Sequence, residues 1–301
     1  MHADAYYSIG KAHTVCQDVA RSGVARGTLG VDVPYVVVCD GCSGSPQTEF
    51  GAQILAQTTV YELRNFQAEH TDEALARGHF IKGLVRASIF RAAMIARECR
   101  LPAGALDATL LTATVAGGVA HLSMSGDGAA FWRERDGRCT LVTVEFNHGA
   151  PAYPSYTLDD KRYDGYRKLS DDGLRTVSTY TSEGAGLHRQ GRDEGHRFAL
   201  IDTREESGME PLVFQVPAQD VDLVAVASDG LGSFQRRVNG AFEGVHAATV
   251  AQHAFAFKNY AGSFVTRRLR RLLSSEAQTM GWHHDDDLSV GAIFIPESEG
   301  K

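Results

Sequence analysis

Several apolar stretches of this chain end in aspartate followed by glycine, and this pattern restricts how the chain can fold. The stretches are Val36–Cys39 before Asp40-Gly41, Leu122–Ser125 before Gly126-Asp127-Gly128, and Val224–Ala227 before Ser228-Asp229-Gly230. The first belongs to the run Val33–Cys39, which is short, β-branched and almost wholly apolar, as is typical of a strand buried on both faces. The pattern therefore predicts buried strands whose ends each present a carboxylate.

A fourth acidic position lies before a strand instead of after one. Asp285-Asp286-Asp287 directly precedes the apolar run Leu288–Ile295. If that run is a strand antiparallel to the others, all four acidic positions gather at one edge of the sheet core. Carboxylates packed so closely repel one another and are costly to desolvate, and divalent cations offset that cost. Ligands that are all oxygen atoms favour Mg²⁺ or Mn²⁺ over Zn²⁺.

Asp-Gly is also the commonest dipeptide of tight hairpin turns, so a single copy indicates a turn more often than a ligand. We interpret Asp136-Gly137 and Asp164-Gly165 as such turns. The other copies differ because each follows an apolar run and because three aspartates precede the last strand. The combination favours a metal centre over a set of unrelated turns.

The periodicity elsewhere predicts a mixture of helices and strands. Helices are expected at Glu49–Arg64, from a cap at Thr71 to about Arg100, and at Gly262–Gln278. Strands are expected at Leu110–Ala116, Val119–Ser125, Ala129–Arg135, Cys139–Glu145, Arg197–Asp202, Leu212–Val216 and Val221–Ala227. Short turns that contain glycine separate the first four strands, which predicts an antiparallel meander of hairpins. The order of elements fits a layered α+β fold in which helices flank packed sheets.

The segment from Asn147 to His196 is polar, rich in glycine and tyrosine, and poorly periodic. We interpret it as loops with short strands, a type of segment that often carries function in a compact domain. Two interpretations stay open: the segment forms part of a substrate surface, or it is a passive insertion.

Composition and charge disfavour several classes of protein. The chain has 301 residues, a formal net charge of −7 and 43% hydrophobic residues. A general nucleic-acid binder is expected to show a basic face, whereas the one basic cluster, Arg267–Arg271, fits the polar face of a helix. No apolar run approaches the roughly 20 residues that cross a bilayer. We therefore expect a single domain over residues 1–301 that binds neither nucleic acid nor membrane.

The five cysteines are scattered and odd in number, which argues against a disulfide framework and for a reducing, cytoplasmic location. Cys39 and Cys42 form a Cys-x-x-Cys pair. No second pair accompanies it, so a redox or zinc site is disfavoured.

Five short motifs occur in order along the chain. They are His13-Thr14-Val15-Cys16-Gln17-Asp18, Asp40-Gly41-Cys42-Ser43-Gly44, Ala108–Ala113 ahead of Gly126-Asp127, Ala227-Ser228-Asp229-Gly230-Leu231, and Asp286-Asp287-Leu288-Ser289-Val290. Together they resemble the metal-dependent protein phosphatase family, also called type 2C, and the first motif resembles that of its bacterial branch. The resemblance covers most of the chain, from about Ser8 to Ile295.

The resemblance implies a central antiparallel β-sandwich with helices on both outer faces, an α/β/β/α arrangement. It also implies two or three metal ions, Mn²⁺ or Mg²⁺. Asp40 is expected to bridge two ions, and the carbonyl oxygen of Gly41 is expected to bind one of them. Asp229 and Asp286 are expected to complete the other site.

The same resemblance assigns Asp18 to metal binding, directly or through water, and Asp127 to a weaker third ion. Two positions differ from the family pattern. His13, with Lys11 close by, stands where an arginine commonly contacts the substrate phosphate. Cys42 stands where many eukaryotic members have a histidine that is often proposed as the general acid. The phosphate contact is therefore open between His13 and Lys11, and the leaving group could take a proton from His13 or from a metal-bound water.

These features predict hydrolysis of phosphoserine or phosphothreonine in a protein substrate that a cognate serine/threonine kinase has phosphorylated. Two cations would activate a water for in-line attack on phosphorus, with Asp40, Asp229 and His13 as the catalytic side chains. Two alternatives stay open. One is a catalytically weak regulatory pseudophosphatase or phosphoprotein-binding module on the same fold, and the other is a hydrolase of a different phosphate ester.

Overall fold

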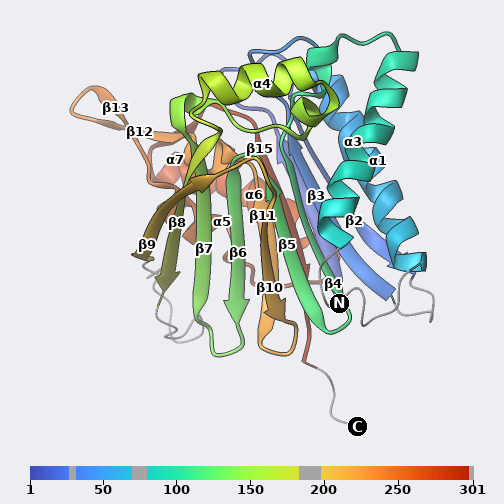
Figure 1. Ribbon diagram of the computed structural model, residues 1–301. Helices are drawn as coiled ribbons and strands as arrows, with labels where there is room; N and C mark the ends of the chain where they lie inside the picture. The colour runs from blue at the N-terminus through green and yellow to red at the C-terminus, as the bar shows by residue number, and fades with distance from the viewer. Residues whose placement is uncertain (27–31, 70–79, 183–197, 298–301) are drawn as a thin grey trace.

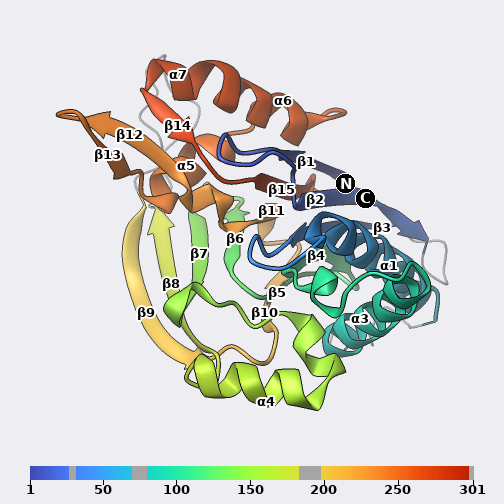
Figure 2. The same ribbon diagram turned by 90° about the horizontal axis from the view of Figure 1, so that it is seen from above.

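Two antiparallel sheets pack face to face at the centre of the fold, and helices cover the outer face of each sheet (Figure 1). The computed structural model describes residues 1–26, 32–69, 80–182 and 198–297. Viewed from above, the layers follow one another as helices, sheet, sheet and helices (Figure 2). This arrangement confirms the expected α+β fold with a central sandwich and helices on both faces.

The strands form two large sheets and one small sheet. The seven-stranded sheet has the order β1 (His2–Ser8), β15 (Leu288–Phe294), β11 (Val221–Ala227), β6 (Gly128–Glu134), β7 (Cys139–Phe146), β8 (Leu174–Ser182) and β9 (Ala199–Ser207). The five-stranded sheet has the order β10 (Leu212–Pro217), β5 (Val119–Ser125), β4 (Leu110–Ala116), β3 (Asp32–Asp40) and β2 (Asp18–Arg26). The small sheet contains β13 (Ala241–Gly244), β12 (Phe234–Val238) and β14 (Trp282–His284).

Helices cover both sheets. On the five-stranded sheet lie α1 (Thr48–Glu69) and α3 (Phe80–Glu98), and on the seven-stranded sheet lie α5 (Ala247–Ala254), α6 (Phe264–Arg271) and α7 (Ala277–Thr279). The predicted cap at Thr71 lies outside the described residues. The predicted helix Gly262–Gln278 is confirmed in outline, although a π-helical turn, η5 (Leu272–Glu276), separates α6 from α7. Within the described ranges, no helix is both long enough and apolar enough to span a membrane.

The apolar strand β3 shows how the layers are held together. Val36 and Val38 lie in the core between the two sheets, whereas Val37 and Cys39 lie in the core against α1 and α3. Successive side chains of a strand point to opposite faces, so a strand with a layer on each side needs an uninterrupted apolar run. The run that ends at Asp40 is apolar for this reason.

The chain passes from one sheet to the other at Gly126-Asp127-Gly128. β4 pairs with β5, and β6 pairs with β7, but β5 and β6 belong to different sheets. The predicted meander is therefore right for the four strands and wrong at this connection, which is not a hairpin. Gly128 has a φ of 126°. A methyl group there would lie 2.6 Å from the carbonyl oxygen of Ala227, so the crossover requires glycine.

The segment that follows β7 contains more regular structure than we predicted. It forms η2 (Asn147–Gly149), η3 (Pro154–Leu158), α4 (Asp160–Leu169) and β8, while residues 183–197 lie outside the described part of the chain. The side chain of Asp159 caps α4 by accepting hydrogen bonds from the backbone of Lys161 and Arg162. Only Tyr166 of this helix is buried, so the helix leaves almost no apolar periodicity in the sequence.

The crossover predicts a difference between two glycine substitutions. Gly128→Ala should lower the free energy of unfolding by about 2 kcal/mol more than Gly137→Ala, because both lie at positive φ but only Gly128 also faces backbone. A methyl group at Gly137 would meet no described atom within 4 Å. Urea denaturation of both variants measures the difference, and equal losses would contradict a tight crossover.

Candidate active site

Asp18 and Asp40 face each other on neighbouring strands of the five-stranded sheet. Asp18 begins β2, Asp40 ends β3, and the two residues are partners in the register. Burial, partly opposed by hydrogen bonds, raises the pKa of Asp18 to about 7. Burial, together with the charges of Asp18 and Asp229, raises the pKa of Asp40 well above its usual value. Adjacent buried carboxylates cannot both ionise without a compensating positive charge.

Asp127, Asp229 and Asp286 reach the same end of the sandwich. Asp229 opens a short helix, η4 (Asp229–Gly232), just after β11, and Asp286 lies just before β15. β11 and β15 are antiparallel, so these two aspartates lie at one edge, as predicted. Burial and the charge of Asp229 raise the pKa of both Asp127 and Asp286. We call these three residues, together with Asp18 and Asp40, the acidic centre.

Ser228 connects the two sheets within this centre. Its hydroxyl donates to Oδ2 of Asp18 at 2.7 Å and accepts from the backbone nitrogen of Ser289 at 3.0 Å. The other carboxylate oxygen of Asp18, Oδ1, is buried and has no hydrogen-bond partner among the described residues. Such an acceptor is unusual in a folded protein and indicates a place for a ligand. We had assigned no role to Ser228, although it precedes Asp229 in the motif.

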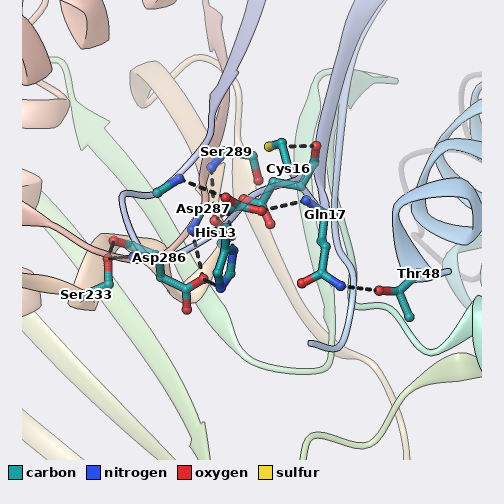
Figure 3. Close-up of polar contacts among 12 residues, drawn as sticks. His13, Cys16, Gln17, Thr48, Ser233, Asp286, Asp287 and Ser289 are labelled. Atoms are coloured by element: carbon teal, nitrogen blue, oxygen red, sulfur yellow. Dashed lines mark hydrogen bonds and ion pairs between the residues drawn. The ribbon is translucent and has the colours of Figure 1, made fainter. Parts of the chain in front are cut away.

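Asp287 fixes the N-terminal loop that carries His13 (Figure 3). Its carboxylate accepts from the backbone nitrogens of Gly10 at 2.8 Å and Gln17 at 2.5 Å. It also lies 3.2 Å from Nδ1 of His13, and Nε2 of His13 lies 3.5 Å from Asp286. Asp287 is absent from our predicted ligands, and the available signal was its place in the closing motif. Its buried position shows that it organises the loop.

His13 reaches the acidic centre, whereas Lys11 is exposed. Burial acts to lower the pKa of His13, but the neighbouring Asp287 and Asp286 outweigh it, so the pKa of His13 is raised. A raised pKa favours the imidazolium form, which carries two N–H donors. The His13 side chain is 23% exposed and can therefore meet a bound ligand.

Hydrogen bonds to Thr109 hold the Asp40 loop. The backbone nitrogen of Asp40 donates to Oγ1 of Thr109 at 3.0 Å, and the nitrogen of Thr109 donates to the carbonyl oxygen of Asp40 at 2.8 Å. Gly41 forms a bridge with Ala108. These contacts explain why the Ala108-Thr109 pair belongs to the site motifs. Cys39 and Cys42 are both free, and Cys39 is fully buried.

The acidic centre fits divalent cations by its chemistry. All its side-chain donors are carboxylate oxygens, which suit Mg²⁺ or Mn²⁺. Burial raises the pKa values of Asp18 and Asp40, and one oxygen of Asp18 has no hydrogen-bond partner among the described residues, so a proton or a bound cation would stabilise the centre. Among the described residues, no three of these side chains surround a common point at coordinating distance.

The raised pKa of Asp18 predicts how pH affects the metal-free protein. Between about pH 4 and pH 7 the folded protein keeps a proton that the unfolded chain has released, so raising the pH lowers the free energy of unfolding. The loss should be on the order of 2–4 kcal/mol and should be smaller in Asp18→Asn. Urea denaturation with chelator at several pH values tests this, with Asp202→Asn on exposed β9 as the control. Equal slopes in wild type and Asp18→Asn would contradict the assignment.

Comparisons with known proteins agree with this geometry. Among solved structures, a bacterial serine phosphatase is 14% identical with a TM-score of 0.55, covering 100% of both chains. The serine/threonine phosphatase Stp1 from Staphylococcus aureus is 14% identical with a TM-score of 0.52, covering 98% of this chain and 96% of that chain. At these identities the structures establish the fold alone. A comparison with curated proteins gave no match. The family model described as protein phosphatase 2C matches residues 8–274, and the chain therefore belongs to the protein phosphatase 2C family.

Proposed function

We propose that this chain is a metal-dependent protein phosphatase that hydrolyses phosphoserine and phosphothreonine. The observation that supports this most directly is the convergence of aspartates from both sheets on one edge, where burial raises the pKa values of Asp18, Asp40, Asp127 and Asp286. Family membership supports a phosphoprotein as the substrate. A serine/threonine kinase would supply that substrate, and we place both in the cytoplasm.

The acidic centre would hold the metal ions. Asp40 and the carbonyl oxygen of Gly41 would bind them from the five-stranded sheet, and Asp229 and Asp286 from the seven-stranded sheet. Asp18 would complete the set, directly or through water, while Asp127 would serve a third ion. Bound Mn²⁺ or Mg²⁺ supplies a water of lowered pKa as nucleophile and neutralises phosphoryl oxygens.

The residues of the chain supply position and protons. Thr109 and Ser228 hold Asp40 and Asp18 in fixed orientations, which restricts the reacting groups to a narrow geometry. His13 in its imidazolium form would donate a hydrogen bond to a phosphoryl oxygen or give a proton to the departing serine or threonine oxygen. We favour His13 over Lys11 in this role because its ring lies against Asp286 and Asp287.

A catalytically weak regulatory member of the family is the second candidate. The observation that favours it is His13, which stands where the family commonly has an arginine. An imidazolium offers two N–H donors, whereas a guanidinium offers five in a fixed fork that matches a phosphate. Retention of the aspartates of the acidic centre favours turnover.

Removal of a proposed ligand should abolish turnover while the fold remains. Asp40→Asn and Asp229→Asn should each lower kcat on a phosphothreonine peptide, with Mn²⁺ present, by on the order of a thousandfold. Excess chelator should stop the wild-type enzyme. Asp202→Asn is the matched control, because Asp202 is exposed on β9. Near wild-type rates in Asp40→Asn would overturn the metal assignment, and a wild-type protein without activity on either this peptide or p-nitrophenyl phosphate would favour the regulatory candidate.

The role of His13 can be separated from that of Lys11. His13→Ala should lower kcat/KM for the peptide by about tenfold to a hundredfold, and His13→Arg should restore much of it, because both carry donors to a phosphate. Lys11→Ala should have little effect, since Lys11 is exposed. Steady-state kinetics of the three variants test this. A larger loss in Lys11→Ala than in His13→Ala would assign the phosphate contact to Lys11.

A further inference from the structure

Asp107 forms a buried polar cluster outside the acidic centre. It directly follows a short helix, η1 (Ala103–Leu106), and is 4% exposed. Its carboxylate accepts from Oγ of Ser45 at 2.9 Å and from Oγ of Ser155 at 2.6 Å. Nη2 of Arg162 donates to both carboxylate oxygens, at 2.7 and 2.8 Å. The Asp107 carboxylate thus joins the end of η1 to two distant segments, the loop with Ser45 and the stretch from Ser155 to Arg162.

One side of this cluster belongs to the loop that carries Asp40. The carbonyl oxygen of Asp107 accepts from the backbone nitrogen of Cys42 at 2.8 Å. Thr109, two residues further on, makes the two hydrogen bonds that hold Asp40. Ser45 lies in the same loop as Cys42. A shift of Asp107 would therefore be passed directly to the Asp40 loop.

The other side belongs to η3 and α4, which lie across the upper edge of the sandwich in Figure 1. The guanidinium of Arg162 also donates to the carbonyl oxygen of Ala103 at 3.3 Å and lies 5.2 Å from the ring centroid of Tyr156. The Tyr156 ring in turn contacts Tyr153 at 5.6 Å and Tyr166 at 4.6 Å. Arg162 therefore anchors a row of packed aromatic rings.

Tyr153 begins this segment, and its side chain is buried. Burial raises the pKa of Tyr153, and Cys42, Asp127 and Asp40 add to the effect. The hydrogen bonds of Asp107 to Ser155 and Arg162 on one side, and to Ser45 and Cys42 on the other, hold the segment that begins at Tyr153 as a wall beside the Asp40 loop.

We propose that Asp107 and Arg162 are positioning residues, which hold the Tyr153–Arg162 segment against the Asp40 loop and thereby set how a phosphorylated polypeptide is seated at the acidic centre. The inference rests on the proposed phosphatase function. Replacing a buried ion pair by apolar residues often leaves the stability of a protein unchanged. We therefore assign the Asp107–Arg162 pair a role in fixing the geometry of the segments that it joins. A small phosphate ester needs only the acidic centre, whereas a polypeptide also needs the wall beside it.

The test compares a peptide with a small substrate. Arg162→Gln, Asp107→Asn and the double variant are assayed with Mn²⁺ on a phosphothreonine peptide and on p-nitrophenyl phosphate. The ratio of kcat/KM for the peptide to kcat/KM for the small ester should fall by about tenfold in each single variant. In the double variant this ratio should fall no further than in the more impaired single variant, because the two residues act as one pair. Arg162→Lys should recover part of the ratio.

Arg175→Gln is the matched control. Arg175 is more buried than Arg162, and like Arg162 it pairs with a carboxylate, that of Glu206, at 2.6 Å between β8 and β9. Its loss should lower the melting temperature and leave the ratio unchanged. If Arg162→Gln behaves in the same way, the Asp107–Arg162 pair has only a structural role and the inference is overturned.

Peptide binding gives a readout that does not depend on turnover. Fluorescence anisotropy with a labelled phosphothreonine peptide should show affinity about tenfold weaker for Arg162→Gln than for wild type and for Arg175→Gln. Unchanged affinity would overturn the inference. If the wild-type protein binds the peptide but does not hydrolyse it, the proposed catalytic function is wrong. Weaker binding by Arg162→Gln would still support the positioning role.

Discussion

Mutual repulsion of buried carboxylates is the constraint around which this molecule is built. Asp18 and Asp40 are register partners on adjacent strands, and burial raises the pKa of both. Side chains in such positions are stable only if they hold protons or if cations neutralise them. Among the described hydrogen bonds and ion pairs, no lysine or arginine contacts these two carboxylates.

The sandwich supplies the rigidity that this arrangement needs. Carboxylates on mobile loops would move apart, whereas these lie at the ends of strands whose faces are packed on both sides. Close backbone contacts add to this effect. A methyl group on Gly230 would lie 1.8 Å from the carbonyl oxygen of Asp287, and one on Gly10 would lie 2.2 Å from that of Asp285. Glycine at both positions lets three distant segments meet without a gap.

Around the acidic centre, a second set of contacts connects the centre to the surface that a substrate would meet. Ser228 and Thr109 hold aspartates directly, whereas Asp107 and Arg162 act through the Asp40 loop. The two sets differ in their chemistry. The Ser228 hydroxyl orients the Asp18 carboxylate and the Thr109 hydroxyl holds the backbone at Asp40, while the Asp107–Arg162 ion pair joins whole segments.

Local sequence was sufficient for the strands packed on both faces and for the acidic positions, whereas β1, β2 and β12 to β14 are absent from the predicted strands. A strand packed on both faces requires a continuous apolar run, and the Asp-Gly endings are visible at once, so Asp40, Asp127 and Asp229 could be placed at strand ends. The antiparallel course of the last strand was a condition in that argument, and the register of β11 with β15 meets it. The family motifs led to the sandwich and to its two layers of helices.

Other features depend on contacts between distant parts of the chain, which no local pattern contains. The change of sheet at Gly126-Asp127-Gly128 looks like a hairpin in sequence, because both use glycine at positive φ. Helix α4 has one buried residue, so it leaves no apolar period. Asp107 and Arg162 are 55 positions apart, and their pairing follows from how η1 and α4 pack. Periodicity reports burial along one element, whereas these features arise where separate elements meet.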